Sequence, residues 1–166
     1  DLRTGFPAIT TKKLAWKSVV GELLWFIEGS QDERRLSEIT HGTREGTVTI
    51  WTPNALAPYW KNKAQFSGDL GRVYGVQWRN WKTPIYHKQE TFKDEFGSVY
   101  NRHGSLHVKE TDQLKNLLEG LVNDPHSRRH IISAWNPGEL DQMALPPCHV
   151  LSQFYVNNNK ELSCHM

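Results

Sequence analysis

This chain of 166 residues has few cysteines and no large excess of positive or negative charge. It has two cysteines, Cys148 and Cys164, and its 20 Lys and Arg side chains nearly balance its 18 Asp and Glu. Two cysteines in unlike contexts do not form the disulfide framework of a small secreted protein, which favours the cytoplasm. A formal net charge of only +2 provides no single-sign field for a nucleic-acid partner.

Long hydrophobic runs are also absent. No apolar stretch reaches the roughly 20 residues of a membrane-spanning helix, and no signal peptide opens the chain. We therefore expect no membrane partner and one domain with a real core, residues 1–166. The first residue is Asp1, and residues 161–166 have the pattern of a strand that is cut short. We expect a domain that is incomplete at both ends.

The segment from 127 to 156 concentrates the chemistry that is present, with the sequence SRRHIISAWNPGELDQMALPPCHVLSQFYV. Cys148 lies where a loop stiffened by prolines enters a predicted strand. A buried structural cysteine is the common alternative for such a residue. Here His149 and the pair Arg128 and Arg129 are near in sequence, and a catalytic thiolate needs electropositive surroundings. The pattern predicts that Cys148 is a nucleophile.

Together with GFPAITTKKL, ELLWFIEGS and GDLGRVYGVQWRNW, in this order, that segment resembles the thymidylate synthases. The resemblance covers nearly the whole chain except about residues 82–110. It implies an α+β fold with a large mixed β-sheet, helices packed on one face, and a homodimer through the other face. It also implies reductive methylation of dUMP to dTMP. The carbon and hydride donor would be 5,10-methylenetetrahydrofolate, with no metal.

The resemblance further assigns roles to individual side chains. One group acts on the pyrimidine ring: a nucleophile that adds to C6, a proton-relay glutamate, a tyrosine beside the ring and a histidine that orders water. A second group reaches the phosphate of the other subunit across the dimer interface, and a third contacts the folate. These are Cys148, Glu22, Tyr74 and His149 for catalysis, Arg128 and Arg129 for the phosphate, and Trp51 and Lys13 for the folate.

Residues 12–28 predict a helix that is apolar nearly all round and therefore buried, capped by Thr10 or Thr11 and stopped by Gly29. Glu22 lies in the middle of this apolar run. A buried carboxylate raises its pKa or finds hydrogen bonds. The alternative is an exposed glutamate on a narrow polar strip.

Two short elements are expected next. Residues 30–33 form a capping-box pattern that starts a helix at Ser30, and residues 47–51 predict a strand that ends at Trp51. Composition alone allows Trp51 to be a core residue. Asn54 stands where many thymidylate synthases have a second pocket tryptophan.

Residues 68–75, GDLGRVYG, resemble a glycine-rich phosphate loop only weakly, and we predict no helix directly after them. Their glycines suit a close approach of a ligand to Tyr74. Arg72 replaces the family's common proline.

Residues 82–110 are polar and predict a surface loop, a variable insertion in the family. Their three histidines, His87, His103 and His107, lack the cysteine or carboxylate company of a metal site. The four leucines within residues 114–121 have helical spacing and predict a core-facing stripe.

The chain ends with predicted strands at 131–135, 150–156 and 161–166, the last two joined as a hairpin by the polar turn 157–160. We expect Cys164, within the last strand, to be structural.

Two alternatives to a synthase remain open. A pyrimidine deoxynucleotide hydroxymethylase would share the fold and the cysteine but let water, rather than hydride, trap the exocyclic carbon. Trp51 favours the synthase and Asn54 slightly weakens that preference. The other alternative is a non-catalytic fragment that needs a complementary segment.

Overall fold

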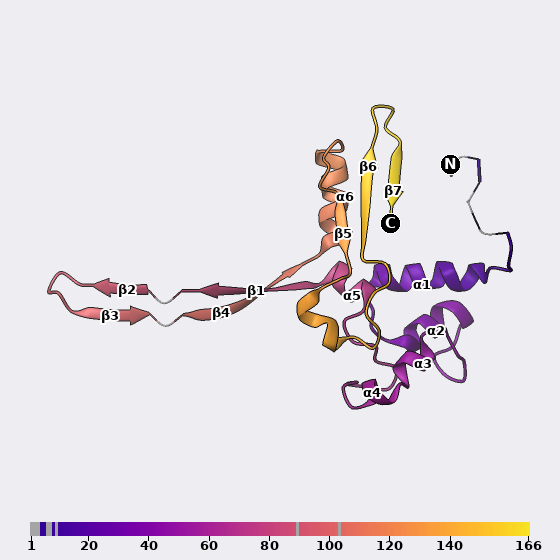
Figure 1. The fold of residues 1–166 in the computed structure, drawn as a ribbon, viewed down its shortest axis with the longest axis horizontal. Coiled ribbons are helices and arrows are strands. Elements are labelled where there is room, and N and C mark those ends of the chain that lie inside the picture. Colours follow the sequence, from indigo (N-terminus) through magenta and orange to yellow (C-terminus); the bar gives the residue numbers. More distant parts are fainter. Residues whose placement is uncertain (1–3, 6–7, 9, 89, 103) are drawn as a thin grey trace.

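The structure is a computed structural model that describes residues 4–5, 8, 10–88, 90–102 and 104–166. It has a body of helices and short strands, from which a long two-stranded ribbon projects to one side (Figure 1). None of the described helices is long and apolar enough to cross a membrane. His103, one of the three histidines considered for a metal, lies outside the described residues.

Six α-helices and one 3-10 helix are described along the chain. They are α1 (Trp16–Glu28), α2 (Glu33–His41), α3 (Thr52–Ala55), α4 (Pro58–Lys61), α5 (Tyr74–Arg79), α6 (Gln113–Asn123) and the 3-10 helix η1 (Pro137–Gln142). Helix α1 begins later than predicted, after Ala15, which provides no side-chain cap, so neither Thr10 nor Thr11 caps it. Its predicted end is confirmed, because Gly29 has φ +73°.

Helix α1 is buried on one side only, so the prediction that it is buried all round is wrong for this chain. Trp25 and Phe26 are at most 8% exposed, because α1 packs against α2 and α5. On its other side, a row of large apolar side chains is 38–51% exposed. That row consists of Trp16, Val19, Val20, Leu23, Leu24 and Ile27.

Two local predictions around α2 need correction. The N-cap of α2 is Asp32, whose side chain accepts from Arg34 N, and not Ser30. Residues 47–50 form no strand. Thr49 instead donates its hydroxyl to the buried carboxylate of Glu33 at 2.7 Å. These polar side chains hold the backbone in turns that compete with an extended strand.

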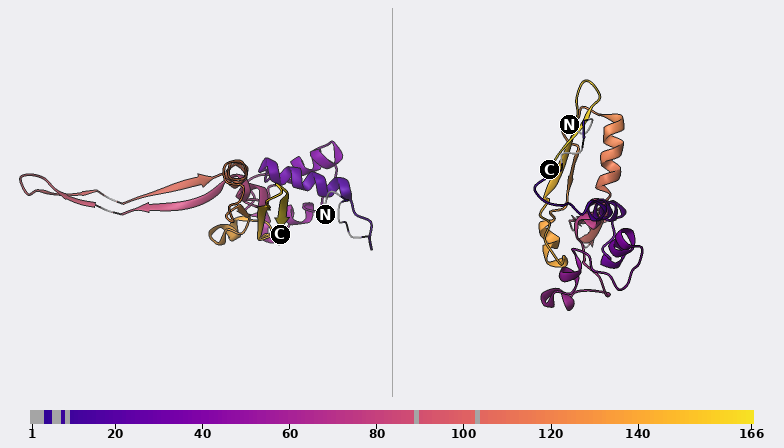
Figure 2. Two further views of the ribbon diagram at one scale, coloured as in Figure 1. Left: turned by 90° about the horizontal axis from the view of Figure 1, so that it is seen from above. Right: turned by 90° about the vertical axis from the view of Figure 1, so that its right-hand side faces the viewer.

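The strands form three small antiparallel sheets, so within the described residues the predicted large mixed sheet is wrong. The largest has the order β5–β6–β7, from β5 (Ile131–Ser133), β6 (Leu151–Val156) and β7 (Leu162–His165). The hairpin of β6 and β7 confirms the predicted turn. Helix α6, not α1, lies along this sheet and contacts β5 (Figure 2, right).

The predicted surface loop at 82–110 is a regular ribbon that extends from the body (Figure 2, left). Strands β1 (Trp81–His87) and β4 (Ser105–Thr111) pair along their full length, and β2 (Glu90–Lys93) pairs with β3 (Val99–Arg102) beyond them. Because a two-stranded ribbon has no enclosed face, most side chains of β1 and β4 are exposed. Its sequence therefore shows little apolar periodicity.

The core is largely aromatic and joins α1, α3 and α5. It contains Trp25, Phe26, Trp51, Tyr74 and Trp78, all at most 8% exposed. The leucine stripe of α6 contributes less than predicted, since only Leu117 is buried and Leu118 is 63% exposed.

The glycines around Tyr74 allow close packing between backbones, and the approach of a ligand to Tyr74 stays a prediction. A Cβ atom on Gly75 would lie 2.3 Å from the Phe26 carbonyl oxygen, and one on Gly71 would lie 2.2 Å from the Gln142 carbonyl oxygen. Contrary to prediction, a helix follows directly, because α5 starts at Tyr74.

Candidate functional site

Tyr74 is the residue around which the predicted catalytic side chains gather. It is the first residue of α5 and is 4% exposed. Its ring stacks on Phe26, with ring centroids 4.7 Å apart at an interplanar angle of 25°. Gly75 lets α5 approach the backbone of α1 closely, which allows this stacking. The stacking in turn fixes where the tyrosine hydroxyl lies.

The Tyr74 hydroxyl holds the loop that carries the predicted nucleophile. It accepts from the backbone N of Cys148 at 2.5 Å and from the backbone N of His149 at 3.3 Å. The Cys148 side chain belongs to an exposed residue with a free thiol. A reactant from solvent can therefore reach the thiol, while the backbone beneath it is tethered to the core.

The loop before Cys148 is tethered at a second place. Ala144 N donates to Leu70 O at 2.9 Å, and Arg72 N donates to Gln142 O at 2.9 Å. These bonds join the segment that leads to Tyr74 with the segment that leads to Cys148. Two stretches about 70 residues apart in sequence thus meet as neighbouring backbones.

Glu22 connects to the same group through Trp51. The Trp51 indole N–H donates to Glu22 Oε1 at 2.5 Å, and its ring meets Tyr74 edge to face at 5.9 Å. Glu22 is half-buried and lies on the wall of a cavity of about 90 Å³ that also includes His41 and Thr49. Of the two alternatives for Glu22, a hydrogen-bonded carboxylate and an exposed one, the structure has the hydrogen-bonded one. Glu22, Trp51, Tyr74, Cys148 and His149 are called the Tyr74 cluster below.

Burial raises the pKa of the Tyr74 hydroxyl above its ordinary value. The N–H groups of His149 and Cys148 oppose this shift, and the negative charge of a Cys148 thiolate adds to it. At neutral pH the Tyr74 hydroxyl therefore keeps its proton beside the cysteine. The site presents an accessible thiol next to a neutral, fixed hydroxyl.

Three of the predicted residues are not brought to this cluster within the chain. Arg128 and Arg129 are exposed in the turn before β5, while the β5–β6 register pairs Ser133 with Leu151 at the end near Cys148. The arginine pair thus lies at the opposite end of the ladder from the cysteine. It does not form, within one chain, the electropositive surroundings that its nearness in sequence predicted. Lys13 lies in the exposed segment before α1.

The other two predicted features are placed as follows. Trp51 is 5% exposed and packs among Trp25, Phe26 and Tyr74, which agrees with the core alternative; its contact with a folate stays a prediction. Cys164 is an exposed residue, which does not fit the expected structural cysteine. Partial burial of its thiol raises its pKa.

A buried polar network beside the cluster was not predicted. The carboxylate of Glu139 accepts from Arg72 Nε at 2.6 Å, from Gln77 Nε2 at 2.8 Å and from Asn136 Nδ2 at 3.2 Å. This network joins α5 to η1, the elements that carry Tyr74 and lead to Cys148. The arginine in place of the family's proline was the signal in the sequence, and the structure pairs it with Glu139.

No group of three or more His, Cys, Asp or Glu side chains in the described part of the chain is arranged to hold a metal ion. His87 and His107 do meet on the ribbon, with ring centroids 5.2 Å apart.

Comparison with known proteins agrees with the sequence resemblance. The sequence pattern of the family described as thymidylate synthase matches residues 1–166. The chain is 48% identical over 163 residues to a probable thymidylate synthase of Escherichia phage T5, covering 96% of this chain and 47% of that protein. It is 42% identical over 166 residues to the thymidylate synthase of Buchnera aphidicola, covering all of this chain and 48% of that protein.

Two further relatives extend the comparison. The bifunctional dihydrofolate reductase-thymidylate synthase of Zea mays is 42% identical over 170 residues, covering all of this chain and 28% of that protein. Among solved structures, the thymidylate synthase of T4 phage superposes with a TM-score of 0.74 at 38% identity, covering 99% of this chain and 47% of that one. This chain thus spans about half the length of the phage T5 and Buchnera relatives. With its whole length matched by the family pattern and its fold by a solved member, the chain belongs to the thymidylate synthase family.

Proposed function

We propose that this chain contributes the nucleophile half of a site that methylates dUMP to dTMP. The observation that carries the proposal is the accessible Cys148 thiol beside the Tyr74 hydroxyl, with Glu22 linked to the same aromatic group through Trp51. In this reaction 5,10-methylenetetrahydrofolate supplies the one-carbon unit and the hydride.

Cys148 would act first, as a thiolate that adds to C6 of the uracil ring. The electron pair of the C5–C6 double bond then moves toward O4, which makes C5 nucleophilic. Tyr74, held neutral by burial, would assist the later removal of the C5 proton. Glu22 would move protons at O4 through water, and His149 would order that water. These roles come from the family resemblance, and the spatial grouping of the four residues supports them.

Arg128 and Arg129 would bind the phosphate of dUMP in the partner subunit of a homodimer. A guanidinium fork matches phosphate oxygens, and both side chains are exposed. Their position at the far end of the β5–β6 ladder from Cys148 supports an arrangement in which they serve another subunit's site. Lys13 and Trp51 would contact the folate.

The activity is proposed for the chain together with the rest of the fold, because its relatives are about twice as long. The exposed apolar row on α1 favours the same view, since 38–51% exposure of six large apolar side chains is costly in water. A complementary segment that covers this row would remove that cost.

Covalent capture of 5-fluoro-dUMP in the presence of folate tests the nucleophile. In a protein of whole family length that carries this sequence, we expect an adduct, seen by mass spectrometry of the intact protein, that Cys148→Ala abolishes. Cys164→Ala, the matched control, should keep it. An adduct that persists in Cys148→Ala, or that disappears only in Cys164→Ala, would overturn the assignment.

A further inference from the structure

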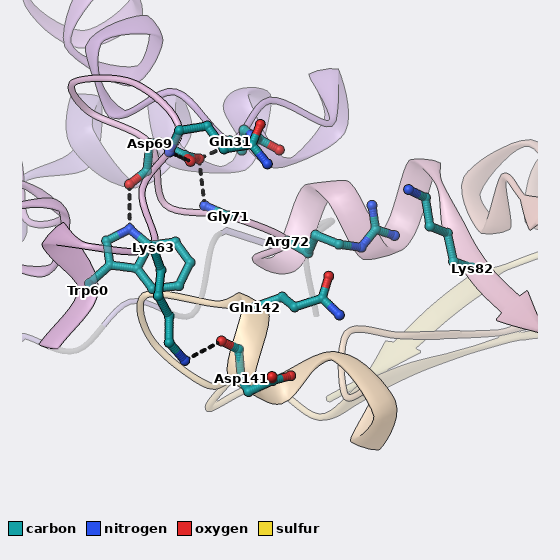
Figure 3. Close-up of a pocket in the computed structure, with 10 residues that line it drawn as sticks. Gln31, Trp60, Lys63, Asp69, Gly71, Arg72, Lys82, Asp141 and Gln142 are labelled. Atoms are coloured by element: carbon teal, nitrogen blue, oxygen red, sulfur yellow. Dashed lines mark hydrogen bonds between the residues drawn. The ribbon is translucent and has the colours of Figure 1, made fainter.

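We propose that a second polar pocket, separate from the Tyr74 cluster, binds a small molecule that bears a phosphate group. The pocket has a volume of about 500 Å³, within the range of small-molecule sites. It lies between the segment after α4, the segment before α5, the start of β1 and the end of η1 (Figure 3). None of the residues that line it belongs to the Tyr74 cluster.

Two cations converge at one end of this pocket. Figure 3 shows the guanidinium of Arg72 and the ammonium of Lys82 pointing toward each other. Arg72 is already paired with Glu139, so Lys82 is the cation whose charge a bound anion at this place would neutralise. Lys82 forms no ion pair within the described part of the chain, although Glu110 is opposite it in the β1–β4 register.

Arg72 is held in place from behind. Its Nε donates to Glu139 at 2.6 Å and its Nη2 donates to the Asn80 carbonyl oxygen, while its side chain is only 14% exposed. A guanidinium has five N–H donors, so these two bonds leave further donors that are directed by the anchored fork. An arginine that is already ordered loses little side-chain entropy when it binds an anion.

The acidic groups of the pocket are engaged elsewhere or lie at the other end. Asp69 is 1% exposed, and its carboxylate accepts from Gln31 Nε2, Gln65 N and Gly71 N. Asp141 lies beside Lys63, whose Nζ donates to the Asp141 carbonyl oxygen at 2.8 Å. Neither acid lies between the two converging cations in Figure 3.

The remaining lining suits the polar body of a phosphomonoester. The amides of Gln31, Gln65 and Gln142 provide donors and acceptors, and the Trp60 ring provides one apolar wall. The dianion would lie between Arg72 and Lys82, with the polar body toward the amides. Neither Arg128 nor Arg129, the residues proposed for the dUMP phosphate, lines this pocket.

Titration of the purified chain with inorganic phosphate, followed by ¹H–¹⁵N NMR, tests the proposal. We expect saturable shifts at the amides of Gly71, Arg72, Lys82 and Gln142, against chloride at matched ionic strength. Lys82→Gln should weaken binding by about tenfold or more, the effect of losing one charge-assisted bond. Lys109→Gln, with the same charge change elsewhere on the ribbon, should leave it unchanged.

Two further arms complete the experiment. Arg128→Ala should leave the shifts at the amides of Gly71, Arg72, Lys82 and Gln142 unchanged, which separates this pocket from the proposed dUMP site. Glycerol 3-phosphate in place of inorganic phosphate identifies the source: tighter binding indicates a phosphomonoester, and equal binding indicates free phosphate. Shifts that do not saturate, that chloride reproduces, or that Lys82→Gln leaves intact would overturn the proposal.

Discussion

The hydroxyl group of Tyr74 holds the loop of the candidate site in place. Tyr74 is buried, yet its oxygen accepts from two consecutive backbone N–H groups, those of Cys148 and His149. Two donors aimed at one oxygen hold the loop at the residue that must be placed most accurately. The phenol ring sets this position because it is stacked on Phe26.

Tyr74→Phe should therefore loosen the cysteine loop without emptying the core. The ring and its stacking remain, while two backbone N–H groups lose their acceptor, so we expect the free energy of unfolding to fall by about 1–3 kcal/mol. Denaturant titration measures the change. Tyr155→Phe is the control, because Tyr155 is 50% exposed. Equal losses in the two variants would show that the Tyr74 hydroxyl does not hold the loop.

The raised pKa of Tyr74 also predicts a pH dependence. In the unfolded chain Tyr74 ionises near pH 10, whereas in the folded chain burial keeps it protonated to higher pH. Its contribution to stability is thus complete below pH 10 and is lost as the pH rises further. Tyr74→Phe should flatten this alkaline loss, measured by denaturation at pH 9 and above; an unchanged slope would contradict the assignment.

At the scale of elements, the close approach of α1 and α5 brings Glu22 and Tyr74 into one group. Gly75 makes this approach possible, since any side chain there would meet the backbone of Phe26. Backbone atoms inside a helix cannot move aside as a flexible side chain can. The two helices would have to separate instead.

We expect Gly75→Ala to lower the free energy of unfolding by at least about 1–3 kcal/mol, the usual cost of overpacking. Gly138→Ala is the matched control, because the nearest atom to its new Cβ would be Asn136 Oδ1 at 3.6 Å. Thermal or denaturant unfolding of both variants measures the difference. If the two substitutions lower the free energy of unfolding equally, α1 and α5 pack less tightly than in the structure.

The ion pair of Arg72 and Glu139 joins the segment before α5 to η1. Both side chains are at most 14% exposed, so removal of one charge leaves the other buried without its partner. Glu139→Gln should lower the free energy of unfolding by about 3 kcal/mol. Glu38→Gln, which disrupts the exposed pair of Glu38 with Arg35, should have a much smaller effect. A small loss for Glu139→Gln would indicate that water reaches this pair.

At the scale of the whole molecule, the chain holds two halves of a proposed site at opposite ends of one sheet. Cys148 precedes β6, and Arg128 and Arg129 precede β5, which runs antiparallel to it. Antiparallel pairing therefore separates residues that are close in sequence. In the proposed homodimer, the nucleotide would contact Cys148 of one subunit and the arginine pair of the other.

We therefore expect residues 1–166 alone not to turn over dUMP. Positioning of reactants supplies up to about 7–11 kcal/mol of a reaction barrier, and this chain spans only about half the length of its relatives, so the rest of the fold would have to supply the missing contacts. Tritium release from C5-labelled dUMP with folate measures turnover. Release at a rate similar to that of a whole thymidylate synthase would contradict the proposed division of the site.

A mixing experiment tests the homodimer in a protein of whole family length that carries this sequence. Arg128→Ala and Cys148→Ala subunits should each be inactive alone. Mixed dimers should recover one working site, since the intact thiol of one subunit would face the intact arginine of the other. Absence of recovery in dimers shown to be mixed would mean that the arginine acts within its own chain.

Much of the candidate site was predictable from local sequence, because its motifs are contiguous. The loop that places Cys148 before a strand, the stop of α1 at Gly29 and the β6–β7 hairpin each depend on prolines, glycines or polar turns within a few residues. The choice of Glu22 and Tyr74 came from the family resemblance. The structure bonds Tyr74 to the cysteine loop and links Glu22 to Tyr74 through Trp51.

Other features were decided only by tertiary structure. Asp32 and not Ser30 caps α2, and residues 47–50 follow the side-chain bonds of Glu33 rather than their β-propensity. Likewise, the polar composition of residues 82–110 did not indicate a paired ribbon, because a ribbon with two exposed faces has no apolar alternation to detect. The local conformational preferences of these segments contribute less free energy than packing and pairing with distant residues.

By itself, then, the sequence determined the family, the identity of the candidate nucleophile and the ends of several elements. Each of these depends on residues that are neighbours along the chain. Only the tertiary structure decided which groups meet: Glu22 with Trp51, Arg72 with Glu139, and Tyr74 with the backbone of Cys148. These contacts join residues 29 to 74 positions apart, and packing of helices and strands, not local conformational preference, determines which distant side chains become neighbours.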